Sequence, residues 1–388
     1  MSGVAIGAQR ENRRRKMCRG RTLLATGFLI VIMAGPISIA ELRAEEVSFA
    51  GKTVEWIVPF PRGGGTDTWA RVYAPYLQRY LPGNPNVVVK NAPGGGLSQI
   101  FSRGGNLSTV NRFHERARPD GLTLLGTSGS TLFPYLLGDP RVKYNYQEWH
   151  IVLASPEGGI VYVNPTTDMK TVRDLKGFKG ELTFATQGTT SLDIVPLLAF
   201  EVLGLEIKAV FGYKGRGPAR KAFELGETNI DYQTTPAYLK AVVPLLKAGK
   251  AISFFSWGQM DHEGNLVRDP AAPDLPHLVE TYEMLNGDQP SGPAFDCWKA
   301  LFVARFAVQK ALWLPRGTPA AIVTAYRETT RRILDDPEFQ NDLKTKLGGY
   351  RQYVGESARQ ALEKALKVPP ESMAWLKEWL KRRFDAEG

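Results

Sequence analysis

Apolar and polar positions along the chain alternate between two periods, which predict β-strands and α-helices in turn. Short apolar runs at 54–60 and 86–90 fit buried strands, whereas the apolar positions within 68–80 recur at helical spacing. From about residue 181 the same order starts again. This alternation favours an α/β fold, and its restart predicts two units.

Further elements continue the pattern to the end of the chain. Strands are predicted at 122–126, in two runs within 149–163, and at 181–185, 206–211, 229–233, 251–256 and 298–308. Helices are predicted at 97–104, 192–203, 219–225, 236–248, 319–334, 337–347 and 358–384. Polar turns at 155–159 and 258–276 mark where the chain enters and leaves the second unit. We therefore expect one domain of 47–152 and 260–388, interrupted by a second of 153–259.

A glycine-rich loop joins the first strand to the first helix. Two prolines end the strand, Gly63-Gly64-Gly65 permit unusual backbone angles, and Thr66 or Asp67 can cap a helix that begins near Trp69. A helix N-terminus that follows such a loop exposes backbone N–H groups, which suit a carboxylate or a phosphate. A glycine-rich turn without any ligand fits the loop equally well.

Similar loops follow two later strands of the same unit, at 91–96 and 127–131. In an open α/β sheet, ligands bind outside the carboxyl ends of the strands. We therefore expect these loops to share one rim with the first. A polar loop at 187–191 occupies the matching position in the second unit.

Charge excludes one class of function. The 388 residues carry a formal net charge of +10, but residues 1–44 hold eight basic and only two acidic side chains. The rest of the chain has a weak basic bias and no basic stretch interleaved with aromatic residues, so nucleic-acid binding is not expected.

The basic N-terminus is typical of a secretory signal peptide. A basic segment at 13–21 precedes an apolar segment at 23–34 and the small-residue pattern Ser38-Ile39-Ala40, which predicts cleavage after Ala40 or Ala44. A membrane anchor is the alternative, although the apolar run is shorter than the roughly 20 residues that span a bilayer. After cleavage Cys297 is the single cysteine, so no intramolecular disulfide can form. These features indicate a periplasmic protein.

Catalytic and metal-binding signatures are missing from the sequence. The four histidines are scattered without ligand spacing, no G-x-S-x-G occurs, and the first glycine loop lacks the Lys of a P-loop. Asp67, Asp193 and Asp231 could act as acid–base groups, but helix capping or contact with a ligand hydroxyl explains each as well. We expect no enzyme, no cofactor and no metal.

Several motifs, in order and spacing over about residues 50–350, resemble the Bug family, the periplasmic solute receptors of tripartite tricarboxylate transporters. They are Val58-Pro59-Phe60-Pro61 with the following glycine loop, Pro93-Gly94-Gly95-Gly96, Arg118-Pro119-Asp120-Gly121, Gln187-Gly188-Thr189-Thr190-Ser191, Gly212-Tyr213-Lys214-Gly215 with Gly217-Pro218-Ala219, and Leu314-Pro315-Arg316-Gly317-Thr318-Pro319. The resemblance implies an α/β two-domain periplasmic-binding-protein-like fold of type II, with one domain inserted in the other. It also implies a small carboxylate held in the cleft, largely by backbone amides, and a membrane permease as partner. The chain departs from the family pattern at Arg62, where a small residue is usual, and at Ile194, where a histidine is usual.

On this resemblance we expect one carboxylate near each of two helix starts. The candidate ligand-binding residues are Phe60, Pro61, Arg62, Gly63, Gly64, Thr66, Asp67, Ser128, Ser130, Thr131, Gly188, Thr189, Thr190, Ser191, Tyr213 and Thr234. Phe60, Trp69 and Tyr213 could instead pack an aromatic acid, although such residues are more often core. A sensor that reports its ligand state to a membrane signalling partner would have the same sequence features.

Overall fold

A computed structural model describes residues 47–94, 105–261 and 263–385 of the chain. The predicted signal peptide and the predicted helix at 97–104 lie outside the described residues. The description below concerns the compact unit that begins at Val47.

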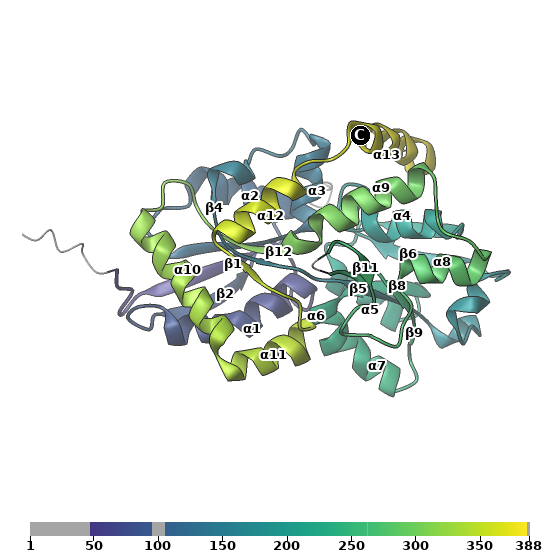
Figure 1. Cartoon of the computed structure of the whole chain (residues 1–388), viewed down its shortest axis with the longest axis horizontal. Coiled ribbons are helices and arrows are strands. Elements are labelled where there is room, and N and C mark those ends of the chain that lie inside the picture. Colours follow the sequence, from purple (N-terminus) through teal and green to yellow (C-terminus); the bar gives the residue numbers. More distant parts are fainter. Residues whose placement is uncertain (1–46, 95–104, 262, 386–388) are drawn as a thin grey trace, which may run out of the picture. The chain divides into compact units, whose positions relative to one another are not determined.

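A six-stranded sheet forms the first lobe, in the order β13-β4-β12-β3-β1-β2 (Figure 1). Strand β1 runs parallel to β2 and β3, whereas β12 is antiparallel to β3 and β4. The strands are β1 (Thr53–Val58), β2 (Asn86–Asn91), β3 (Thr123–Ser128), β4 (His150–Ser155), β12 (Lys310–Leu314) and β13 (Tyr353–Val354).

Alternating side chains of this sheet enter two cores, one on each face. Trp56 and Leu124 pack with Trp69 of α1 and Phe339 of α11, while Leu125 on the opposite face packs in the other core. This period of two is the one expected for strands covered on both faces. The first-lobe helices are α1 (Gly65–Tyr80), α2 (Gly105–Arg116), α3 (Gly129–Leu137), α10 (Ala320–Asp335), α11 (Pro337–Leu347) and α12 (Glu356–Ala365).

The second lobe contains an antiparallel sheet, β8-β5-β9, and a parallel pair, β6 and β7. Its strands are β5 (Gly159–Val163), β6 (Leu182–Thr186), β7 (Ile207–Phe211), β8 (Ile230–Thr234) and β9 (Ile252–Ser256). A short hairpin of β10 (Gln259–Met260) and β11 (Leu266–Val267) follows. Its helices are α4 (Ile194–Val202), α5 (Arg216–Glu224), α6 (Thr235–Ala237) and α7 (Val243–Lys247). Two later helices, α8 (Leu278–Asn286) and α9 (Pro293–Phe302), pack in the same core as α4. The C-terminal helix α13 (Pro370–Phe384) buries Trp379 in the same core as α4 and α9.

The lobes are joined where β4 leads into β5 through Pro156-Glu157-Gly158. Glu157 in this crossing and Lys310 at the start of β12 form a buried ion pair, with Nζ and Oε2 2.8 Å apart. Lys310 lies beside Ser128 on β3 and Ser155 on β4. The ion pair therefore fixes the crossing to the end of the first-lobe sheet.

Three sequence predictions about local structure are wrong. The single helix predicted at 358–384 is two helices, α12 and α13, with a break before Pro369-Pro370. The segment 298–308 is the end of α9 followed by a 3₁₀ segment (Val303–Val308), and the strand there is β12, which starts at Lys310. Its buried residues Trp298, Leu301 and Phe302 are spaced three and four apart, as on a helix face. The first helix begins at Gly65 rather than near Trp69, and no side chain caps its N-cap Gly64.

Within the described part of the chain, no helix combines the length and the apolar character that a bilayer crossing requires.

Candidate functional site

Three helices begin around one cavity between the lobes. The N-termini of α1 and α3 come from the first lobe and that of α5 from the second, and the cavity measures about 30 Å³. The residues that line it are Phe60, Pro61, Gly64, Gly65, Thr66, Ser128, Ser130, Gln187, Leu192, Gly215, Arg216, Gly217, Thr234 and Lys310. A helix start presents N–H groups that have no partner inside the helix and carries a partial positive charge. This arrangement therefore suits an anion.

Asp67 holds the first glycine loop in shape. Its Oδ2 accepts a hydrogen bond from the Gly63 N–H at 2.9 Å, and its Oδ1 accepts from Arg71 Nε and Asn91 Nδ2 at 2.8 and 2.9 Å. Both carboxylate oxygens are thus engaged within the first lobe. Asp67 positions the amides of the loop and does not line the cavity.

The glycine loops of the two lobes touch each other directly. A Cβ on Gly217 would lie 2.9 Å from the carbonyl oxygen of Arg62, and one on Gly65 would overlap the hydroxyl of Thr234. The Arg220 guanidinium adds a hydrogen bond from Nη1 to the Gly63 carbonyl oxygen at 3.0 Å. Backbone of one lobe can approach backbone of the other this closely because glycine has no side chain. The structure is therefore a closed arrangement of the lobes.

A buried aspartate organises the second-lobe wall. Asp193 accepts hydrogen bonds from the Gln187 N–H at 2.7 Å and from Tyr232 OH at 3.2 Å. The Arg216 guanidinium forms ion pairs with both Asp193 and Asp231. Two carboxylates thus match the charge of Arg216, so the guanidinium chiefly holds the start of α5 in place.

Ser130 links the lobes across the cavity. Its hydroxyl donates to Gln187 Oε1 at 3.4 Å and accepts from the Leu192 N–H at 3.2 Å. The neighbouring Ser128 caps α3, because its hydroxyl accepts from the Ser130 N–H at 3.2 Å. Both hydroxyls therefore lie at the helix start that faces the cavity.

Charge in the cavity wall is positive. Among the described lining residues there are two cations, Arg216 and Lys310, and no Asp or Glu. Burial raises the pKa of Glu157, and the nearby Lys310 ammonium opposes that rise. Because Glu157 is the ion-pair partner of Lys310 and two aspartates are those of Arg216, the helix starts are the main source of positive potential.

Seven of the sixteen predicted ligand residues line the cavity: Phe60, Pro61, Gly64, Thr66, Ser128, Ser130 and Thr234. Nine others lie outside its lining: Arg62, Gly63, Asp67, Thr131, Gly188, Thr189, Thr190, Ser191 and Tyr213. Arg62 is exposed, Thr131 is fully buried in the cap of α3, and Tyr213 OH donates to Glu227 Oε2 at 3.3 Å. The Ser191 hydroxyl is also engaged, since it donates to the Gly188 carbonyl oxygen.

Sequence reasoning missed half of the lining. The missed residues are Gly65, Gln187, Leu192, Gly215, Arg216, Gly217 and Lys310. Gly215-Arg216-Gly217 carried a readable signal, because they follow a strand and open a helix as the first loop does. Lys310 carried no such signal in the sequence.

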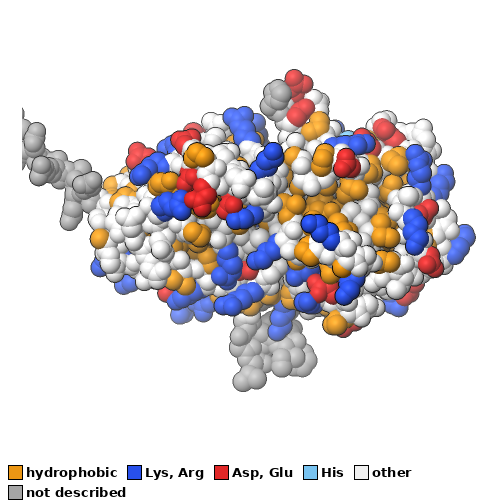
Figure 2. Space-filling view, turned by 90° about the horizontal axis from the view of Figure 1, so that it is seen from below, with side chains coloured by type: hydrophobic (Ala, Val, Ile, Leu, Met, Phe, Trp, Pro, Cys, Tyr) orange, Lys and Arg blue, Asp and Glu red, His pale blue; other side chains and the backbone are white. Residues whose placement is uncertain are grey.

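The described side chains of the face shown in Figure 2 give no sign of a nucleic-acid site. Among the described residues of the face in Figure 2, Lys and Arg side chains are spread between Asp and Glu side chains without a continuous basic patch. In the same described part of the chain, no group of three or more His, Cys, Asp or Glu residues could hold a metal ion.

Comparison with known proteins identifies relatives over most of the chain. No family profile matches. BugT of Bordetella pertussis is 30% identical over 234 residues, which are 57% of this chain and 65%, just under two thirds, of BugT. A UPF0065 protein of Pseudomonas sp. strain P51 is 23% identical over 334 residues, which are 84% of this chain and 85% of that protein. The chain resembles the Bug family of periplasmic solute-binding proteins over most of its length.

Solved structures confirm the α/β two-domain fold expected for a Bug-family protein. BugD matches with a TM-score of 0.61 and 22% identity, over 85% of this chain and 97% of BugD. MatC of Rhodopseudomonas palustris with bound malate matches with a TM-score of 0.58 and 22% identity, over 81% and 96% of the two chains. A protein of the same organism with adipate matches with a TM-score of 0.60 and 20% identity, over 85% and 96%.

Similarity to the Bug family also bears on catalysis. Solute-binding proteins of that family are not enzymes, which agrees with the expectation that this chain is not one.

Proposed function

We propose that this protein captures a small carboxylate between its two lobes in the periplasm and delivers it to the permease of a tripartite tricarboxylate-type transporter. One observation carries the proposal. Helix starts from both lobes, α1, α3 and α5, surround a single cavity whose described lining contains Lys310 and Arg216 but no acidic side chain. Such a wall stabilises an anion and repels a cation.

The proposed donors belong mostly to the main chain. Amides of Gly64–Thr66 and of Gly215–Gly217 would bind one carboxylate from the two sides, with the hydroxyls of Ser128 and Ser130 beside them. The Lys310 ammonium, paired with Glu157, lines the same cavity. Because the closed cavity excludes bulk water, each of these hydrogen bonds is stronger than it would be in an open cleft.

Binding requires the lobes to separate. A cavity of about 30 Å³ holds one water molecule but no dicarboxylate. Opening would break the Arg220–Gly63 hydrogen bond and the contact of Gly217 with the first loop, and closure on a ligand would restore them. The ligand would thereby report its presence to a permease as a change in lobe separation.

Relatives and the N-terminal sequence support the finer parts of the proposal. Two proteins with this fold have been solved with the carboxylates malate and adipate. The basic, apolar and small-residue order of residues 13–44 supports export by a cleaved signal peptide. We further propose the domain division expected from the sequence, 47–152 with 260–388 and 153–259, with α9 and α13 packed on the second domain.

The test is binding by protein purified from the periplasmic fraction. Titration calorimetry and thermal unfolding should show binding of malate, succinate or adipate and no binding of the matching diamides, because the site recognises charge. Incubation with the bound acid should yield no product by NMR. A panel of carboxylates that leaves both the heat signal and the melting temperature unchanged would refute the proposal.

A further inference from the structure

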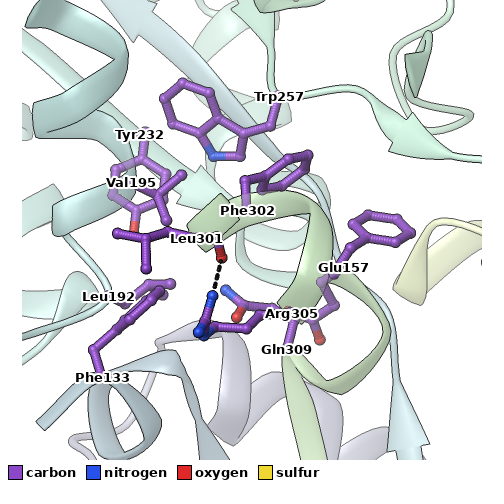
Figure 3. Close-up of a pocket in the computed structure, with 11 residues that line it drawn as sticks. Phe133, Glu157, Leu192, Val195, Tyr232, Trp257, Leu301, Phe302, Arg305 and Gln309 are labelled. Carbon is purple, nitrogen blue, oxygen red and sulfur yellow. Dashed lines mark hydrogen bonds between the residues drawn. The ribbon is translucent and has the colours of Figure 1, made fainter. Parts of the chain in front are cut away.

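A second, smaller cavity lies next to the first (Figure 3). It measures about 10 Å³, and most of its wall is apolar. The lining residues are Phe133, Glu157, Leu192, Val195, Tyr232, Trp257, Leu301, Phe302, Arg305, Phe306 and Gln309. Both lobes contribute to it, as they do to the first cavity.

Shared residues make the two cavities neighbours. Leu192 lines both, and Glu157 of the second cavity pairs with Lys310 of the first. On α3, Ser130 faces the first cavity and Phe133, one turn further, faces the second. A displacement of the Leu192 side chain would therefore join them.

Arg305 brings a charge into this apolar cavity. Its side chain is 2% exposed, and its Nη1 donates to the carbonyl oxygens of Ala300 and Leu301 at 2.8 and 3.3 Å. Figure 3 shows the guanidinium among the lining side chains, with its hydrogen bond to Leu301. Nε and Nη2 have no hydrogen-bond partner. Burial lowers the pKa of this guanidinium to about 9, which reflects the cost of holding the charge there.

The two unpaired nitrogens form one edge of the guanidinium. Nε–H and one Nη2–H are parallel, and this edge fits the two oxygens of a carboxylate. In the described part of the chain no Asp or Glu forms an ion pair with Arg305, and the Phe133 ring lies 5.6 Å from its central carbon. Two other buried cations of this region have carboxylate partners: Arg216 has two aspartates and Lys310 has Glu157. Arg305 therefore lacks the anion that a buried guanidinium requires.

We propose that Arg305 binds a second carboxylate of the solute, so that the ligand is a dicarboxylate with an apolar body. One carboxylate would lie at the helix starts, the body would pass Leu192 between Phe133 and Phe302, and the other carboxylate would meet the Nε–Nη2 edge. Ser130 and Phe133 are about 4.5 Å apart along the axis of α3, so the body that spans them is several methylenes or an aromatic ring. This inference rests on the proposed function and adds the class of ligand.

The test compares diacids with analogues that keep one carboxylate. Titration calorimetry would measure wild-type protein with adipate, pimelate and terephthalate, and with the monoamide of each. We expect at least one diacid to bind roughly 10- to 100-fold more tightly than its monoamide, the range for hydrogen bonds to a charged partner. In Arg305→Met this preference should fall to within about twofold, with the monoamide affinity kept.

Stability and a conservative variant separate binding from a structural role. Arg305→Met should unfold, without ligand, at the same temperature or higher, because it removes an unpaired buried charge. Arg305→Lys keeps the charge without the planar edge and should retain only part of the preference. A wild-type protein that binds monoamide and diacid equally would overturn the inference and leave the proposed function intact. A lower melting temperature in Arg305→Met with the diacid preference unchanged would overturn it too, whereas a protein that binds neither probe would refute both proposals.

Discussion

Gly217 offers a direct test of closure. It lies in the first turn of α5, and a Cβ there would be 2.9 Å from the Arg62 carbonyl oxygen and 3.3 Å from backbone atoms of Gly63 and Gly64. These neighbours are main-chain atoms of the opposite lobe, so no side chain can rotate away. In Gly217→Ala the lobes could close fully only by shifting one loop.

The two expected effects of this substitution have opposite signs. Alanine is a better helix former than glycine, by about 1 kcal/mol in a helix interior, and this gain is present whether the lobes are open or closed. Overpacking a tight contact costs about 1–3 kcal/mol and applies only to the closed state. The carboxylate should therefore bind roughly 5- to 150-fold more weakly, while the protein without ligand should be as stable as wild type or more stable.

Calorimetry with malate or adipate and stopped-flow fluorescence from Trp257, which lines the neighbouring cavity, would measure affinity and dissociation rate. Lys221→Ala, on the exposed side of the same helix, is the matched control and should leave both unchanged. An affinity for Gly217→Ala within about twofold of wild type would show that the close approach of the two glycine loops does not limit closure.

Three further predictions concern buried groups. Lys310→Met leaves the Glu157 carboxylate buried without its partner, so the free energy of unfolding should fall by about 3–5 kcal/mol at pH 8. The loss should be smaller at pH 5, because burial raises the pKa of Glu157 and protonation removes the charge of its carboxylate. An equal loss at both pH values in urea titrations would contradict this reasoning. Burial also raises the pKa of Asp269 to about 6, so the folded protein holds this proton more tightly than the unfolded chain. The free energy of unfolding that Asp269 contributes near pH 4 is then lost as pH rises through about 6, by up to about 3 kcal/mol. Asp269→Asn should remove this pH dependence, as measured by urea unfolding at several pH values between 4 and 8. Finally, burial raises the pKa of Cys297 to about 12, so a disulfide reagent at pH 8 should label one thiol in guanidinium and none in the native protein; rapid native labelling would show that this helix opens.

Local signals were enough to predict the glycine loops. The prolines and glycines at 59–65 mark a strand end and a helix start, and Pro61, Gly64 and Gly65 of this segment line the cavity with Ser128 and Ser130. The same reasoning extends to Gly215 and Gly217. The spacing of apolar residues also predicted most strands and helices, because these spacings are regular over the length of each element.

Residues whose role depends on distant partners could not be predicted. Lys310 reads as a surface lysine before an apolar run, and only sheet pairing with Ser128 and Ser155 buries it. Arg305 lies in a segment predicted as a strand, since its apolar neighbours form an almost unbroken run. The helical spacing of Trp298 and Leu301 becomes decisive only once α4 and α13 cover that face.

The donors proposed for the first carboxylate are peptide N–H groups of Gly64–Thr66 and Gly215–Gly217. Side-chain substitutions therefore do not remove these hydrogen-bond donors. Replacing one ordinary residue by another keeps its N–H, so alanine at Thr66 or Arg216 would leave that donor in place, and alanine at Gly65 or Gly217 would act through the added Cβ rather than through a lost donor. An amide-to-ester exchange in the main chain would delete one donor at a time. Diverged sequences can therefore inherit the anion site with the backbone, while side chains further along the cleft, Arg305 among them, are left to decide which acid fits.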